Sequence, residues 1–314
     1  SLTVFGLLTF IESKVPFPVI LLERFFPHYG WIESLLVGVY GGVVAYNMHD
    51  VKKSIIWRKY TWLLFSIVFF SQLGLGLLGV EKCLMTGKLH LPVPMVILGG
   101  PLYRGSPSFM TYLFLSTVLI VGPGWCSHLC YFGSFDNYLA FYKEKSKSLS
   151  LKVIYICKSA ILAVVIIFAL AFRFAGVDYL VAGMAGLLFG LIGVAIMILI
   201  SRVKGVMVHC VTFCPIGTVV NILRLLNPFR LRIDSKCNRC MRCVAVCRYN
   251  ALGRKALARG KPFFTCTLCG DCLSSCSKNF ISYTLLGLKY NKVRNGYLFL
   301  SISLHAIFLA LARV

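Results

Sequence analysis

The chain has 314 residues, 58% of them hydrophobic, and a mean hydropathy of +0.81, which excludes an ordinary soluble globular domain and predicts a membrane protein in contact with the lipid bilayer. Its formal net charge of +23 would suggest nucleic acid in a soluble chain. Here the lysines and arginines lie between apolar runs, as in loops retained in the cytoplasm, so we expect no nucleic-acid partner.

Apolar segments of about 20 residues, enough to cross a bilayer, recur along the chain. Residues 1–30 come first and are interrupted by Lys14, Pro16 and Pro18, so we expect an interfacial or re-entrant segment rather than a full span. Because no initiator Met and no cleavage-site pattern are visible, we expect the start to be processed or trimmed. Six predicted spans follow, near residues 31–48, 60–80, 108–125, 153–175, 179–201 and 296–313.

Basic residues gather in alternate loops between these spans. The first and third loops are rich in Lys and Arg, and the fifth contains a long basic run over residues 202–294. The opposite loops carry few, so the positive-inside rule places the first, third and fifth loops in the cytoplasm and both termini outside. Lys158 lies near the cytoplasmic end of an apolar run, and we expect its ammonium to snorkel to that surface.

The second loop, residues 81–107, is long and apolar for a simple connection and contains four prolines. Two interpretations stay open. It is an ordered loop that covers helix ends, or it folds back on the membrane and shapes a pocket for a quinone or a partner subunit.

Two CxxxC pairs follow the third and fifth spans. Cys126 and Cys130 form the first pair, Cys210 and Cys214 the second, and an apolar residue and a glycine follow each pair. The repeat predicts two related helical hairpins, with both sulfurs of a pair on one helical face. If a pseudo-twofold relates the hairpins, the four thiols converge on a third metal site; the alternatives are a redox dithiol or packed cysteines.

Two histidines accompany these pairs. His128 lies inside the first pair and His209 directly precedes the second. Each is a candidate metal ligand or hydrogen-bond donor to sulfur, and the alternative is a satisfied interfacial histidine.

Eight later cysteines form two CxxCxxCxxxC motifs, a spacing typical of two-cluster bacterial ferredoxins, in which the fourth cysteine ligates the other cluster. A pair of zinc sites is the alternative, although zinc sites favour longer gaps between two CxxC halves. Arg248 and Ser277 replace the usual proline after the fourth cysteine, so we expect looser turns. The spacing assigns Cys237, Cys240, Cys243 and Cys276 to cluster 1, and Cys266, Cys269, Cys272 and Cys247 to cluster 2.

Positive side chains crowd the same loops. Nearby cations should raise the potential of an anionic cluster and help an acidic redox partner to dock. Retention of basic loops on the cytoplasmic side explains the same charges equally well. The residues concerned are Arg239, Arg242, Arg248, Arg254, Lys255 and Lys261.

The combination of two membrane hairpins that end in CxxxC, the second followed by Pro215, and a tandem 4Fe-4S module resembles the NapH/NosR-type membrane polyferredoxins over residues 31–285. The resemblance implies that the four CxxxC cysteines match the family's membrane-edge cysteines and the eight later ones its cluster ligands. It further implies electron transfer between a quinone pool or a cytoplasmic donor and a partner redox protein. The setting would be a prokaryotic cytoplasmic (inner) membrane.

We therefore predict a mainly α fold: a polytopic transmembrane bundle of about six spans, with a small cytoplasmic two-cluster ferredoxin-like α+β domain inserted before the last span. The function predicted is that of an iron–sulfur electron-transfer subunit of a larger membrane complex rather than a stand-alone enzyme. The alternative is a redox-sensing or maturation protein without turnover. The predicted domains are an N-terminal segment 1–30, a transmembrane domain 31–229, the ferredoxin-like domain 230–285 and a C-terminal helix 286–314.

Overall fold

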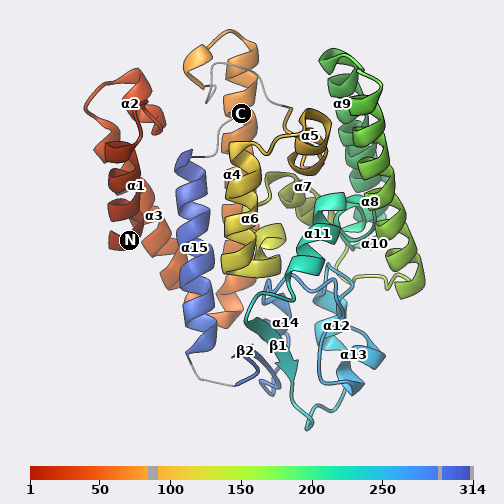
Figure 1. The fold of residues 1–314 in the computed structure, drawn as a ribbon. Coiled ribbons are helices and arrows are strands. Elements are labelled where there is room, and N and C mark those ends of the chain that lie inside the picture. Colours follow the sequence, from red (N-terminus) through yellow and green to blue (C-terminus); the bar gives the residue numbers. More distant parts are fainter. Residues whose placement is uncertain (84–90, 289–291, 312–314) are drawn as a thin grey trace. The chain divides into compact units, whose positions relative to one another are not determined.

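In a computed structural model the chain is described at residues 1–83, 91–288 and 292–311, and this part is mainly helical with one two-stranded sheet (Figure 1). Contacts divide the chain into two compact units. The first comprises residues 1–90 and 295–314, and the second comprises residues 91–294. This division follows packing, and the predicted domain boundaries stay a prediction.

The first unit is a small helical assembly. Helix α1 has 13 residues, too few to cross a bilayer alone, and it packs against α3 through a core that includes Val4, Leu8 and Val37. Asp50 caps α4 by accepting a hydrogen bond from the Lys52 backbone N–H at 2.8 Å. The elements are α1 (Leu2–Lys14), α2 (Leu21–Phe25), α3 (Gly30–His49), α4 (Val51–Leu77), the 3₁₀ turn η1 (Glu81–Cys83) and most of α15 (Val293–Leu311).

The second unit contains the cysteine motifs. Its helical part comprises α5 (Val96–Arg104), α6 (Phe109–Val121), η2 (Gly122–Gly124), η3 (Trp125–Leu129), α7 (Tyr131–Ala140), α8 (Leu151–Phe174), α9 (Tyr179–Ile196), η4 (Met197–Ser201), α10 (Arg202–Lys204), η5 (His209–Phe213) and α11 (Pro215–Leu223). Here η3, η4 and η5 are π-helical turns.

The rest of the second unit is a small cysteine-rich module. Its sheet pairs β1 (Phe229–Ile233) with β2 (Ile281–Leu285) in antiparallel register, Phe229 opposite Leu285 and Ile233 opposite Ile281. Alternate residues of β1 are buried, as the period of a strand requires. The two strands therefore enclose the eight later cysteines in the chain. The segment between them also forms three short helices, which lie beside the sheet: α12 (Arg242–Val246), α13 (Arg254–Ala258) and α14 (Asp271–Ser274) (Figure 1).

Five helical segments among the described residues are long and apolar enough to cross a membrane. The first predicted span, near residues 31–48, lies on α3, which has 20 residues but carries Glu33, Asn47 and His49 and is not one of the five. The count of six therefore stays a prediction. The five segments are Val51–Leu77, Phe109–Leu129, Leu151–Phe174, Tyr179–Lys204 and Val293–Leu311.

The outer faces of α8 and α9 carry large apolar side chains. Ile156, Ile167 and Leu188 are 60–68% exposed. Such surface is costly in water, at about 25 cal/mol for each Å². The faces are compatible with contact with lipid, as the composition predicts.

The predicted loop 81–107 is only partly described, because residues 84–90 lie outside the described residues. Residues Val96–Arg104 of this loop form α5, which packs against α8 and α6. Tyr103 donates a hydrogen bond from its hydroxyl to the Val177 carbonyl at 2.6 Å. This part of the loop is an ordered helix, and the quinone pocket stays a prediction.

Candidate metal centres

The first set of module cysteines surrounds one cavity. Cys237, Cys240, Cys243 and Cys276 all line it, and its volume is about 210 Å³. The first three come from one CxxCxxC loop and the fourth comes from the other motif. The structure thus brings together the four cysteines of this set, and their role as ligands of cluster 1 stays a prediction.

The second set lies beside the first. Burial raises the pKa of Cys272 well above its usual value, and Cys269, Cys266 and Cys247 are near enough to raise it further. Cys243 of the first set also contributes, so the two sets are neighbours. Cys247 thus lies near three cysteines of the other motif, and the assignment of these four to cluster 2 stays a prediction.

The backbone repeats itself in the two motifs. Left-handed residues occur at three equivalent positions: Arg239 and Leu268, Met241 and Gly270, and Asn250 and Asn279. The fourth cysteine of each motif accepts a backbone N–H from four residues later, Ala251 to Cys247 Sγ and Phe280 to Cys276 Sγ, both at 3.3 Å. Left-handed non-glycine residues cost roughly 1–3 kcal/mol each, and such strain persists only where the surroundings impose it. The repeated strain indicates loops shaped around a bound group.

The module is firmly joined to the helical part of the second unit. Arg248 is buried and donates hydrogen bonds to the carbonyls of Gly205 at 2.9 Å and Glu144 at 3.2 Å, with its guanidinium over the Phe141 ring. Asn250 both donates to and accepts from the Leu149 backbone at 3.0 Å. These contacts hold the module against the helical part, and the looser turn predicted at Arg248 stays a prediction.

The two CxxxC pairs share one local structure. Cys126 lies in the π turn η3 and Cys210 in η5, and each turn closes on its second cysteine through Cys130 N–H to Trp125 O at 3.0 Å and Cys214 N–H to His209 O at 2.9 Å. A π turn is wider than an α turn and is frequent at functional sites. The repeat predicted from sequence is therefore present, although its cysteines lie on π turns rather than on a regular α-helical face.

The second cysteine of each pair caps the helix that follows. Cys130 Sγ accepts the Gly133 backbone N–H at 3.4 Å at the start of α7. Cys214 occupies the same N-cap position before α11, where burial raises the pKa of its thiol and the nearby N–H groups of Gly217 and Ile216 partly offset that rise. Free N–H groups at a helix N-terminus stabilise a thiolate.

All four CxxxC cysteines line a single cavity, which we call the chamber. It lies at the ends of η3 and η5 and has a volume of about 20 Å³. Its other lining residues include Trp125, Lys158, Thr265 and Thr267. Lys158 is 3% exposed, so the prediction that it snorkels to the surface is wrong.

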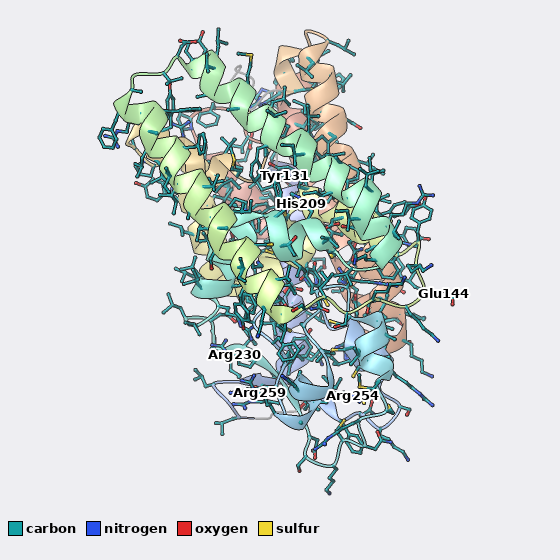
Figure 2. The ribbon with its side chains drawn as sticks, turned by 90° about the vertical axis from the view of Figure 1, so that its right-hand side faces the viewer. Tyr131, Glu144, His209, Arg230, Arg254 and Arg259 are labelled. Atoms are coloured by element: carbon teal, nitrogen blue, oxygen red, sulfur yellow. The ribbon has the colours of Figure 1, made fainter. Side chains whose placement is uncertain are left out.

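The two histidines lie outside the chamber wall. His128 is buried, with Nδ1 3.0 Å from Ser127 Oγ and 3.3 Å from the Gly124 carbonyl. His209 packs against Phe132 and Phe213, and burial lowers its pKa to about 3. Figure 2 shows His209 and Tyr131 among the helices, whereas Arg254 and Arg259 lie on the module.

The thiols of the two module sets and of the chamber all fit a bound metal group. Burial raises the pKa of Cys130 and Cys247 to about 12, and that of Cys243 to about 11. A metal deprotonates a thiol that coordinates it, so these buried thiols would become thiolates on binding one. The residues present therefore fit a thiolate-ligated metal group.

The cavity at the first set favours a cluster over a single ion. Zinc draws its four sulfurs to within about 2.3 Å of one point. Among the described residues, no three His, Cys, Asp or Glu side chains are placed to hold a single ion. The cavity of cluster 1, at about 210 Å³, instead has room for a core of several atoms.

Unpartnered donors in the chamber wall also call for a negatively charged group. Trp125 Nε1, Thr265 Oγ1 and Thr267 Oγ1 are buried without a hydrogen-bond partner. Each such donor costs about 1–3 kcal/mol. Sulfur atoms of an anionic centre would accept these bonds. The sequence analysis did not predict that these residues line the chamber. The one sequence feature that pointed to it was Lys158, a lysine within an apolar span.

Together, the helical fold with its candidate spans and its clustered thiols defines a class: membrane-compatible iron–sulfur proteins. A family model described as a 4Fe-4S binding domain matches residues 105–148 and 186–233. These two segments contain the CxxxC pairs, and the match supports at least one 4Fe-4S cluster in this chain. No curated protein and no solved structure matches.

Proposed function

We propose that the protein is a membrane-anchored iron–sulfur electron-transfer subunit that relays electrons between a quinone pool or a cytoplasmic donor and a partner redox protein. The observation that carries the proposal is the convergence of Cys276 with the three cysteines of the other motif on one cavity. Two 4Fe-4S clusters are held by the ligand sets predicted from the motifs. The chamber cysteines hold a third iron–sulfur centre, which the family match over both CxxxC segments supports.

The solvent exposure of their cysteines suggests an order for these centres, from the protein surface to the chamber. Cys240 of the first set is exposed, whereas Cys266 and Cys272 of the second set are buried. Thr265 and Thr267, on either side of Cys266, line the chamber. Electrons therefore pass between the surface and the chamber by way of the second set.

The chain's own residues hold and insulate these centres. A bound cluster supplies one-electron oxidation and reduction, and such transfer needs no general acid or base. The amide N–H groups that point at Cys247 and Cys276 stabilise their thiolates. Arg248 holds the second set against the helical part, so the distance to the chamber stays constant.

The partner protein docks around Cys240. Exposed cations surround this cysteine and favour an acidic redox protein through electrostatic steering. By the positive-inside rule they also favour the cytoplasmic face of a prokaryotic inner membrane for the module, the setting that the resemblance to the NapH/NosR-type proteins implies. These cations are Lys236, Arg239, Arg242 and Lys278.

The proposal is tested in vesicles that contain the anaerobically purified protein. Addition of a quinol analogue, or of a reduced acidic ferredoxin, should bleach the visible iron–sulfur absorption within seconds, and added oxidant should restore it. Cys240→Ser should slow the reaction with the ferredoxin, whereas Cys157→Ser, outside all three sets, should not. Clusters that neither donor reduces would contradict electron transfer and favour the redox-sensing or maturation protein.

A further inference from the structure

Lys158 occupies an unusual place for a lysine in a candidate span. It extends from α8 into the chamber wall, is 3% exposed, and lies close enough to Cys126, Cys210 and Cys214 for electrostatic interaction. Among the described residues that line the chamber there is no Asp or Glu. The charge that balances this ammonium within the chamber must therefore come from the thiolates and what they bind.

The surrounding residues make room for this ammonium. A Cβ atom on Gly217 would lie 3.3 Å from Lys158 Nζ and 3.0 Å from the Cys210 carbonyl oxygen. Glycine at this position leaves that space open. Outside the wall, the Asp136 carboxylate accepts the Cys210 backbone N–H at 3.0 Å.

Lys158 also touches the loop of the second set. Its Nζ lies 5.8 Å from the centroid of the Phe264 ring, which stacks on Tyr155 of the same helix at 4.2 Å. Phe264 precedes Cys266 by two residues. One cation therefore adjoins both the chamber and the ligand loop of the neighbouring cluster.

We propose that Lys158 is the residue that tunes the chamber: its ammonium donates hydrogen bonds to the sulfurs of the centre held there and raises that centre's reduction potential above that of the second set. This inference rests on the proposed function. A positive charge and hydrogen bonds to sulfur stabilise the reduced, more negative state of an iron–sulfur centre. The buried N–H and O–H groups of Trp125, Thr265 and Thr267 act in the same direction.

The consequence is a direction for the last transfer. With both centres bound, one electron would pass from the reduced cluster held by the second set to the centre held by the chamber cysteines, which would oxidise the first and reduce the second. No covalent bond forms or breaks and no proton moves. The chamber is then the site where electrons collect before they reach an acceptor at the membrane.

The test is an anaerobic redox titration of the holoprotein followed by electron paramagnetic resonance. Lys158→Met should shift the chamber equilibrium at least tenfold toward the oxidised form, which is about 59 mV for a one-electron couple. The potentials of the module clusters should change less than that of the chamber centre. Lys152→Met removes an exposed lysine from the same helix and should change nothing.

An unchanged chamber potential in Lys158→Met would overturn the inference. If that variant loses the chamber iron, Lys158→Arg decides: retention of the centre near its original potential supports the role of charge, and loss in both variants indicates a purely structural role. A wild-type protein with loaded module clusters and no chamber iron would instead refute the third centre of the proposed function, and this inference with it.

Discussion

Replacement of Arg248 by methionine tests whether the stability of the cysteine-rich module depends on the contacts that this side chain makes with the helical part. The guanidinium donates two hydrogen bonds to carbonyls, at 2.9 and 3.2 Å, and lies 4.8 Å from the centroid of the Phe141 ring. Hydrogen bonds to charged groups contribute about 1.5–3 kcal/mol each, and methionine keeps most of the apolar stem. Arg248→Met should therefore lower the free energy of unfolding by about 3 kcal/mol or more.

Thermal denaturation of the detergent-purified holoprotein measures this effect, with visible iron–sulfur absorption as the signal. For a unit of about 200 residues, 1 kcal/mol shifts Tm by about 2–4 °C, so we expect a fall of about 6–12 °C. Arg254→Met is the matched control, because Arg254 is an exposed arginine of the same module (Figure 2). Equal Tm values for the two variants would refute the claim that the Arg248 contacts stabilise the module.

Three further variants examine the chamber and the loops. Cys126→Ser should remove iron from the chamber and leave the module clusters intact, as Mössbauer spectra would show; an unchanged iron content would count against the third centre. Gly217→Ala should place a Cβ atom 3.0 Å from the Cys210 carbonyl oxygen and lower the free energy of unfolding by about 1–3 kcal/mol. Gly183→Ala, with open space around it, should leave that free energy nearly unchanged, and equal effects of the two variants on Tm would contradict the close packing at Gly217. Asn250→Ala should cost more than Asn250→Gly, since both lose the bonds to Leu149 but only alanine is strained at φ 50°; the reverse order in thermal melts would argue against backbone strain there.

The cysteine motifs show how much spacing alone can predict. Two-residue gaps leave few ways to gather four sulfurs, so the partnership of Cys276 with Cys237 follows from the motifs themselves. The helical character and the candidate spans likewise follow from apolar runs, because hydropathy depends on local sequence only. The segment on α3 is less apolar, and it is the predicted span that is not among the five candidate spans.

Other features depend on contacts that sequence does not display. Lys158 lies on a helix that is apolar nearly all round, so no amphipathic pattern indicates which way its side chain points. Arg248 finds its acceptors at Glu144 and Gly205, far away in sequence. The π turns around Cys126 and Cys210 add one residue to an α turn, a local change that the CxxxC spacing does not reveal.

The most direct test of the account is the metal content of the anaerobically purified protein. Two 4Fe-4S clusters in the module require about eight irons and as many acid-labile sulfides per chain, with more if the chamber is loaded, and no zinc. Replacement of all four cysteines of the first set by serine should remove about four irons. Stoichiometric zinc in place of iron, or iron that these substitutions do not reduce, would contradict the central claim.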